Sequence, residues 1–454
     1  MERWLLVAIG LFFAAIAFRW GGVEPQEWVL ALVASGAILA LSGIRRGQPI
    51  LRPNRVLLGC AVALVSWSFI QALPLPPQLV QLISPARYAY YLHTREMTVP
   101  GTWTSLSLFP AESFRWAVTV LALSGWFLLG RWLVYQFSPV PWRVVVPFLV
   151  VAVAQAVLGL VQVYAVGAPL AQGTYVNRNH FAGLLELAFP LLVTGGLTAY
   201  WSRRHRREAP LAPALFAGLI LGAAALVVIA VVLSLSRGGF AAILFSALLM
   251  GVAAATRTLS GKWRAVALML AAVAVVSGFL YLPTDALIRR FAALAETEEL
   301  SADTRLQIWK DTIRMIRAYL WTGCGLGAYQ SALMPFCRTA PMNTVNFAHN
   351  DWLQLLAEWG LIGFALWLVL VVRCFQAAVA ASHSPQFSTR MLGLGCFGAL
   401  AAIALHSLVD FNLYVPANAM FAVWIASVAE GIRPRWSRLR PWMPGVLEPK
   451  FGGR

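Results

Sequence analysis

Four short polar clusters interrupt an otherwise apolar chain, at residues 175–180, 234–239, 303–305 and 348–351. His349, in the last cluster, could act as a general base, because an imidazole with a reference pKa of about 6.5 can take a proton from a hydroxyl near neutral pH. A histidine that only bonds a backbone carbonyl at a membrane interface is the competing interpretation. The residue types therefore indicate proton abstraction from an alcohol as the candidate chemistry.

Three arginines stand in the other clusters: Arg178, Arg237 and Arg305. A guanidinium presents donors in a planar fork that matches phosphate oxygens. A helix that starts at Arg178 or Arg237 adds backbone donors and a favourable dipole. Each arginine alone could equally extend to lipid headgroups or cap carbonyl groups. Together the three predict a site for a lipid-linked diphosphate at a membrane surface.

The side chains that flank these arginines and the histidine are further candidates for substrate contact or support: Asn177, His180 and Asn350. His406 and Asp410 are four residues apart and so share a helix face. They suit a substrate contact, a supporting role or simple helix-end structure. Glu186 and Glu358 lie in or near apolar runs, where a carboxyl group is either functional or a hydrogen-bonded structural group.

The sequence shows no signature of metal or cofactor chemistry. It has no paired Cys/His spacing of a zinc site, no glycine-rich phosphate loop and no Asp-x-Asp pair in a polar segment. We therefore expect neither a metal nor a cofactor. Of the five cysteines, Cys324 and Cys337 fall in one polar segment, where a disulfide and simple packing are both open interpretations.

The 454-residue chain that carries these clusters is 60% hydrophobic and only 12% charged, with a mean hydropathy of +0.72. This composition excludes ordinary soluble and disordered proteins. Apolar runs of bilayer-spanning length occur near 3–18, 27–44, 56–73, 115–133, 143–166, 180–201, 211–233, 238–256, 264–282, 351–373, 390–409 and 415–432. The first run has features of a cleaved signal peptide, but no polar mature domain follows it, which favours an uncleaved anchor.

The positions of the basic residues decide how the formal net charge of +17 is interpreted. Most of the 35 Lys and Arg residues fall in the two termini and in alternate loops between the apolar runs. Under the positive-inside rule, this distribution places both termini and the basic loops in the cytoplasm. The charge is therefore a topology signal, and no nucleic-acid partner is indicated.

This orientation divides the chain into four parts. Residues 1–282 hold spans one to nine, with an external segment at 74–114, and residues 283–350 form a large external loop. Residues 351–432 hold spans ten to twelve, and 433–454 form a basic cytoplasmic tail.

The external segments have local patterns of their own. Residues 88–91 indicate an amphipathic helix, and 102–106 have the composition of a strand. Residues 303–316 predict a helix with Asp303 as its N-cap. A loop of this length is usually functional, and three glycines after the helix are possible hinges: Gly323, Gly325 and Gly327.

At these clusters the chain resembles the O-antigen ligase/polymerase superfamily of bacterial inner-membrane glycosyltransferases. His349-Asn350 is followed by nine residues, then Gly360, two residues and Gly363. This matches the family pattern of His, then Asn/Ser/Gln, nine residues, Gly, two residues and Gly/Thr/Tyr. Other similar features are the turn at 236–238, the helix at 305–309, the long external loop and the twelve-span layout. The resemblance is strongest from about 170 to 415.

The resemblance implies an all-α, GT-C-like polytopic membrane fold, with about twelve transmembrane helices and a large periplasmic loop, in the bacterial inner membrane. It implies a metal-independent, inverting-type oligosaccharide transferase whose active site faces the periplasm. The donor would be a glycan on undecaprenyl diphosphate, and the acceptor a sugar hydroxyl. His349 would be the base, while Arg237 and Arg305 would bind the diphosphate and neutralise its growing charge. Arg178 is added from its position and not from the family pattern.

Two questions stay open at this point. Residues 176–183 and 406–412 look like those of exopolysaccharide polymerases, whereas the histidine–glycine pattern is more typical of ligases. The acceptor is therefore either lipid A-core or another lipid-linked repeat unit. The alternative from a different class is a transporter or flippase of lipid-linked glycans. It would predict polar groups near the bilayer midplane in broken helices, whereas here they gather at the ends of apolar runs.

Overall fold

The computed structural model describes residues 2–23, 54–94, 103–204, 211–258, 302–338 and 345–432, with isolated positions in 30–36 and 261–269. Two of the expected spans, near 27–44 and 264–282, lie largely outside the described residues. The basic tail at 433–454 and residues 283–301 lie outside them as well.

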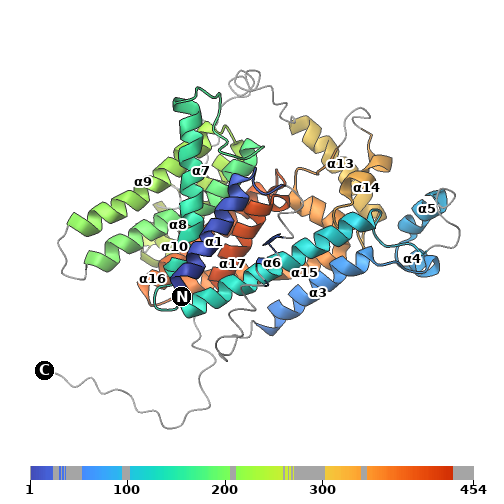
Figure 1. Cartoon of the computed structure of the whole chain (residues 1–454), viewed down its shortest axis with the longest axis horizontal. Coiled ribbons are helices and arrows are strands. Elements are labelled where there is room, and N and C mark those ends of the chain that lie inside the picture. The colour runs from blue at the N-terminus through green and yellow to red at the C-terminus, as the bar shows by residue number, and fades with distance from the viewer. Residues whose placement is uncertain are drawn as a thin grey trace, which may run out of the picture.

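The described residues form a bundle of helices (Figure 1). Eight helices are long and apolar enough to cross a membrane. They are α3 (Arg55–Ala72), α6 (Pro110–Gln136), α7 (Val146–Tyr164), α8 (Arg178–Arg204), α9 (Leu211–Leu233), α10 (Arg237–Thr258), α15 (Asp351–Ser382) and α16 (Phe387–His406). Two shorter helices, α1 (Glu2–Phe18) and α17 (Pro416–Gly431), pack among them. The fold is that of an all-α polytopic membrane protein.

The part of the chain that the structure describes contains no β-strand. The strand-like stretch at 102–106 forms only an isolated antiparallel bridge, between Thr104 and Leu75. Thr104 N donates to Leu75 O at 2.9 Å, but the helix α4 (Pro77–Ile83) begins two residues after Leu75. Because the segment that contains Leu75 becomes helical at Pro77, the pairing with Thr104 cannot extend into a strand. The strand prediction is therefore wrong.

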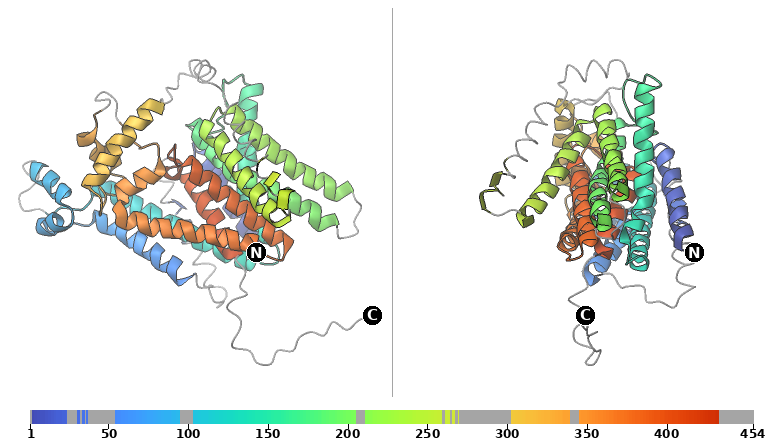
Figure 2. Two further views of the ribbon diagram at one scale, coloured as in Figure 1. Left: turned by 180° about the vertical axis from the view of Figure 1, so that it is seen from behind. Right: turned by 90° about the vertical axis from the view of Figure 1, so that its left-hand side faces the viewer.

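Helix α17 occupies the interior of the bundle (Figures 1 and 2). Its residues are small or apolar on every side, and nearly all of them are buried, as expected for a helix that is covered all round. Phe13 of α1 packs against it, with ring centroids 4.8 Å from Phe421 and 5.2 Å from Trp424. One face of α1 therefore belongs to the core of the bundle.

The polar segments gather at one end of the bundle, where α4, α5 (Pro85–Thr94), α13 (Ala302–Ala318) and α14 (Tyr329–Leu333) lie (Figures 1 and 2). Helix α5 confirms the amphipathic helix expected at 88–91, and α13 confirms the helix expected at 303–316. Because α13 begins at Ala302, Asp303 lies in its first turn and not at its N-cap.

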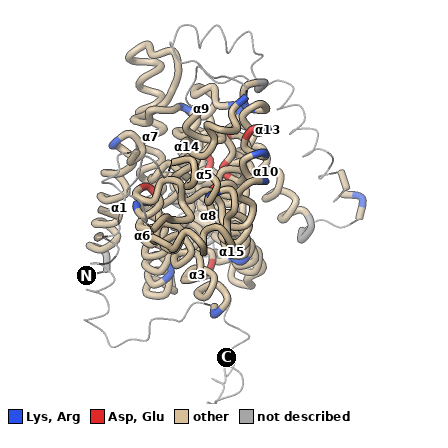
Figure 3. The backbone as a smooth tube through the Cα atoms, turned by 90° about the vertical axis from the view of Figure 1, so that its right-hand side faces the viewer, with Lys and Arg blue, Asp and Glu red and all other residues tan. Residues whose placement is uncertain are grey.

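Basic residues lie mainly toward the ends of the bundle, whereas acidic residues also occur in its interior (Figure 3). Two of these buried acids are Glu186 of α8 and Glu358 of α15. Glu358 accepts a hydrogen bond from the Tyr414 hydroxyl at 2.6 Å and another from the Gln354 amide at 3.4 Å. Glu358 is thus a hydrogen-bonded carboxyl group, which agrees with the structural one of the two interpretations that the sequence left open.

Helix α15 is broken at Gly360, whose φ of 64° and ψ of −174° are not helical. That region of backbone space is accessible in practice only to glycine. A Cβ at Gly360 would lie 2.5 Å from Trp321 O and 2.6 Å from Thr322 C. Glycine is therefore required twice, by the backbone angle and by the segment that packs against it. This gives the first glycine of the family pattern a physical reason.

We expect Gly360→Ala to destabilise the fold by about 2 kcal/mol or more, because it adds backbone strain and a clash with main-chain atoms. Gly251→Ala is the matched control. Gly251 lies inside α10 with nothing within 4 Å of its missing Cβ, so alanine there should leave stability unchanged or raise it slightly. Thermal unfolding of the two purified variants in detergent checks this. Equal unfolding midpoints would contradict the account.

Candidate active site

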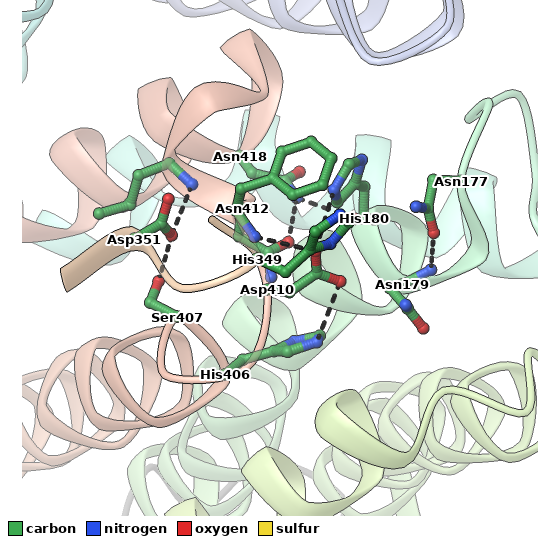
Figure 4. Close-up of polar contacts among 12 residues, drawn as sticks. Asn177, Asn179, His180, His349, Asp351, His406, Ser407, Asp410, Asn412 and Asn418 are labelled. Carbon is green, nitrogen blue, oxygen red and sulfur yellow. Dashed lines mark hydrogen bonds and ion pairs between the residues drawn. The ribbon is translucent and has the colours of Figure 1, made fainter. Parts of the chain in front are cut away.

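Several helix ends converge on a buried polar cluster, centred on Asp410 in the turn between α16 and α17 (Figure 4). The first turn of α8, the residues before α15, the last residue of α16 and the start of α17 all contribute to it. Three histidines face Asp410, from three different parts of the chain. The Asp410 side chain is almost completely buried, so these neighbours set its charge state.

His349 is the most exposed of the three histidines, with 21% of its side chain accessible. Its Nδ1 lies 3.9 Å from Asp410 Oδ1, and its ring meets the edge of Phe411 with centroids 5.0 Å apart. This geometry ties one ring nitrogen to the carboxylate. A partly exposed imidazole oriented in this way is the arrangement a general base needs.

The backbone of His349 is in the left-handed region, with φ of +48°. Such strain in a residue other than glycine costs roughly 1–3 kcal/mol and persists only where neighbours enforce it. Here Asn350 caps α15 by accepting a hydrogen bond from Leu353 N at 3.1 Å. On the other side, Ala348 N donates to Gln354 Oε1 at 2.9 Å. Both neighbours of His349 are thus fixed, which fixes the direction of its imidazole.

His180 approaches Asp410 from the first turn of α8, with Nε2 3.6 Å from Asp410 Oδ1. Its ring also meets Phe411 edge-on, with centroids 4.5 Å apart. Asn418 of α17 fixes the start of α8, because its amide donates to His180 O and to Asn412 Oδ1, both at 2.9 Å. His180 and His349 therefore share one carboxylate oxygen.

His406 joins the cluster from the C-terminal end of α16. Its Nδ1 lies 2.8 Å from Glu186 Oε2, a hydrogen bond between two fully buried side chains. Its other nitrogen, Nε2, lies 4.0 Å from Asp410 Oδ2. The predicted proximity of His406 and Asp410 is confirmed, and the partner of Glu186 is identified.

Burial raises the pKa of Asp410, but the facing imidazoles of His180 and His349 lower it by more. His406 acts in the same direction. The net effect holds the pKa of this carboxyl well below its usual range. Asp410 is therefore a fixed negative charge that polarises the histidines around it.

Asp351 connects the start of α15 to the turn that carries Asp410. Its Oδ2 accepts hydrogen bonds from Ser407 Oγ at 2.6 Å and from Leu413 N at 3.0 Å. Its own N–H donates to Ser407 O at 2.8 Å. The sequence places Asp351 beside His349 but assigns it no role. Its position two residues after the candidate base was the available signal.

Arg178 and Arg237 begin α8 and α10, so each lies at a helix N-terminus beside the cluster. Arg178 precedes His180 by two residues and is buried. The glycines after Arg237 allow close packing, since a Cβ at Gly238 would lie 2.6 Å from His406 Nε2. A Cβ at Gly239 would lie 2.5 Å from Ala182 Cβ. The Ser-Arg-Gly-Gly turn therefore packs closely against His406 and α8, directly after Arg237.

Arg305 lies on α13, one helical turn before Trp309. The Trp309 indole donates to Ala348 O at 2.9 Å, which attaches α13 directly beside His349. Residues four apart share a helix face, so Arg305 is on the face of α13 that turns toward this segment. All three predicted arginines thus come from elements in contact with the cluster.

Two residues expected near the substrate have local structural contacts. The Asn177 side chain accepts a hydrogen bond from Asn179 N at 2.7 Å at the start of α8, and Asn350 is the N-cap of α15. Asn412 and Asn418 belong to the cluster but were not predicted. Asn418 bonds Asn412 six residues away, but it also donates to His180 O across 238 positions, and no local pattern indicates that contact.

Within the described residues, no group of three or more His, Cys, Asp and Glu side chains could hold a metal ion. Cys324 and Cys337 are both free cysteines, so they do not form the disulfide that the sequence left open. Cys324 is instead a packing residue, and its burial raises the pKa of its thiol well above the usual value.

A cavity of about 480 Å³ lies between α3, α6, α15, α16 and α17. Its walls are mainly leucine, valine, alanine and aromatic side chains. Its lining also includes Ser407 and Tyr414, which donate hydrogen bonds to Asp351 and Glu358. The apolar cavity therefore reaches the polar cluster.

Residues 222–368 match the model of the O-antigen ligase family. No curated protein matches the chain. The matched region contains Arg237, Arg305, His349 and Gly360, while Asp410 lies beyond it. The matched residues thus include the candidate base, two of the arginines and the helix break, and the match supports the relation of this region to the O-antigen ligase/polymerase superfamily.

Proposed function

We propose that this protein is a membrane glycosyltransferase that moves a glycan from undecaprenyl diphosphate to a sugar hydroxyl. The observation that carries the proposal is the pairing of His349 Nδ1 with the buried carboxylate of Asp410 at 3.9 Å. The carboxylate orients the ring, so that the second nitrogen, Nε2, can accept a proton. The family match supports the same reaction class.

In the proposed step, His349 Nε2 takes the proton of the acceptor hydroxyl as its oxygen attacks C1 of the donor sugar. The bond between C1 and the diphosphate oxygen breaks, and its electron pair leaves with the lipid diphosphate. Attack from the face opposite the leaving group would invert the anomeric centre. The leaving diphosphate gains negative charge, which donors placed in advance around the site can stabilise.

Arg237, Arg305 and Arg178 are proposed to supply that stabilisation. They belong to three separate elements, α10, α13 and α8, that all contact the polar cluster. A guanidinium binds phosphate oxygens through two parallel hydrogen bonds. With the positive charge provided by side chains, the proposed reaction includes no resident metal ion and no cofactor.

The apolar cavity supports a lipid-linked substrate, because an aliphatic chain in it would place a polar head beside the cluster. The basic ends of the bundle support the orientation. Arg143, Arg373 and Arg390 lie near the helix ends opposite those that meet at the cluster, and basic loops face the cytoplasm. We therefore propose a bacterial inner-membrane location, cytoplasmic termini and a periplasmic active site on a GT-C-like scaffold of about twelve spans.

The structure contains one feature that a transporter would also have, namely the broken helix α15. In transporters the break lines a substrate cavity near the bilayer midplane. Here the break at Gly360 is filled by protein backbone from residues 320–325. This favours the enzyme over a transporter or flippase of the same glycans.

The test is transfer by the purified protein from an undecaprenyl-diphosphate glycan, with lipid A-core and a lipid-linked repeat unit offered together as acceptors. We expect a new glycosidic bond to one of them and release of undecaprenyl diphosphate. Transfer to lipid A-core identifies a ligase, and transfer to the repeat unit a polymerase. Transfer to neither acceptor, by protein that unfolds cooperatively, would refute the proposed reaction.

A further inference from the structure

The break in α15 replaces bonds within the helix by bonds to the segment that follows α13. In an unbroken helix, Leu361 and Ile362 would donate to Ala357 O and Glu358 O. Instead, Leu361 N donates to Leu320 O at 2.7 Å and Ile362 N to Trp321 O at 3.3 Å.

The carbonyl groups released by the break find donors in the same segment. Cys324 N donates to Ala357 O at 2.9 Å, and Gly325 N donates to Glu358 O at 3.1 Å. We call residues 320–326 the crossing segment. Four backbone hydrogen bonds therefore join the end of α13 to α15, at the level where α15 is interrupted.

A single side chain from a third element completes this junction. Gln71 is the penultimate residue of α3 and is fully buried. Its amide nitrogen donates to Thr322 O at 2.7 Å and to Glu358 O at 2.8 Å, and its amide oxygen accepts from Leu326 N at 3.3 Å. One side chain thus bonds both the crossing segment and α15.

The junction matters because α13 and α15 carry different parts of the candidate site. Arg305 is near the start of α13, and His349 directly precedes α15. The two helices are joined near His349 by the bond from Trp309 to Ala348 O, and at the other end by the crossing segment. Two separated attachments fix the position of one helix along the other.

We propose that Gln71 is a positioning residue that sets the placement of Arg305 relative to His349, by holding the crossing segment against the broken helix. The proposal rests on the transferase function argued above, since it assigns Arg305 to the diphosphate and His349 to the acceptor. A buried amide with three partners in two segments is suited to this role, because it bonds Thr322 O and Leu326 N of the crossing segment and Glu358 O of α15 at the same time.

The test is Gln71→Leu, which keeps the size of the side chain and removes all three bonds. We expect kcat for glycan transfer to fall about 10- to 100-fold, with the KM of the acceptor nearly unchanged, because small displacements of catalytic groups have effects of this size. When Gln71→Leu is added to Arg305→Ala, kcat should fall little further than in Arg305→Ala alone. A residue that acts through Arg305 has no further effect once that arginine is gone.

Ser68→Ala is the matched control. Ser68 lies on α3 one turn before Gln71 and is equally buried, but its hydroxyl donates to Leu64 O within α3 and accepts from the indole of Trp359 in α15. It does not touch the crossing segment, so its effect should be small and the same with or without Arg305. Equal losses for Gln71→Leu in both backgrounds would overturn the proposal, as would full activity of Gln71→Leu.

A readout that needs no turnover separates this proposal from the function on which it rests. Hydrogen exchange of the Cys324, Gly325 and Leu361 amides should accelerate in Gln71→Leu and stay unchanged in Ser68→Ala. Unchanged exchange in Gln71→Leu would refute the junction itself. If the wild-type protein shows no transfer while exchange responds as expected, the proposed function fails, and Gln71 is then a structural residue only.

Discussion

His349→Ala is expected to lower kcat for glycan transfer by about 10²- to 10⁴-fold, the usual contribution of a general base. The acceptor hydroxyl would then lose its proton only to water. Donor affinity should change little, because the arginines assigned to the diphosphate are on other elements. The measurement is steady-state transfer by purified protein, with donor and acceptor varied separately.

Alanine at position 349 would also have to adopt a strained backbone, since His349 has a φ of +48°. A loss of activity in His349→Ala could then arise from that strain and not from loss of the base. His349→Asn removes this ambiguity, because asparagine tolerates the left-handed region far better than alanine. His383→Ala is the control for loss of a histidine as such, since His383 is exposed at the opposite end of α15. Full turnover by His349→Asn would show that the base is another group.

Asp410→Asn is expected to lower kcat by about 10²- to 10⁴-fold, by analogy with loss of the carboxylate that orients a catalytic histidine. The substitution keeps the shape of the side chain and removes the charge that three histidines face. Asp311→Asn is the matched control, because Asp311 is just as buried on α13 but pairs with Arg314. If Asp410→Asn and Asp311→Asn lowered kcat equally, Asp410 would have no special role.

The low pKa of Asp410 also predicts how its contribution to stability depends on pH. A carboxyl group whose pKa is lower in the folded state stabilises the fold above its unfolded pKa, which is about 3.9. That contribution is lost as the pH falls through the folded pKa. The difference in unfolding midpoint between wild type and Asp410→Asn should therefore be present at about pH 5 and shrink in stronger acid.

The sequence predicted the features that follow from local patterns. Apolar length placed the described spans, helical spacing placed α5 and α13, and a separation of four residues placed His406 beside Asp410. The four polar clusters were also expected to act together, and the structure brings the elements that carry them into contact.

Other features depend on contacts between residues far apart in the chain, and no local pattern contains them. Glu186 pairs with His406 across 220 positions. The amide of Gln71 donates a hydrogen bond to Glu358 O across 287 positions. Similarly, three glycines interpreted as hinges are close-packing positions in the structure. A Cβ at Gly325 would lie 2.7 Å from Ser107 Cα, and one at Gly327 would lie 2.7 Å from Trp116 Nε1.

The pattern of His, Asn, nine residues, Gly, two residues and Gly acquires a physical explanation. Asn350 caps α15 and fixes the backbone of His349. Gly360 breaks the helix so that the crossing segment can bond to it. Gly363 leaves room for two indoles, since a Cβ there would lie 2.7 Å from atoms of both Trp67 and Trp359. The motif therefore combines the candidate base with the junction that positions it.

The most direct test of the central claim is reconstitution of the protein into vesicles with an undecaprenyl-diphosphate glycan and the acceptor that it uses. Two quantities are followed together: formation of the glycosidic bond, and movement of the donor across the bilayer. We expect bond formation with equal release of undecaprenyl diphosphate, lost in His349→Asn, and no movement of the donor. Movement of the donor without bond formation would contradict the central claim and identify a transporter.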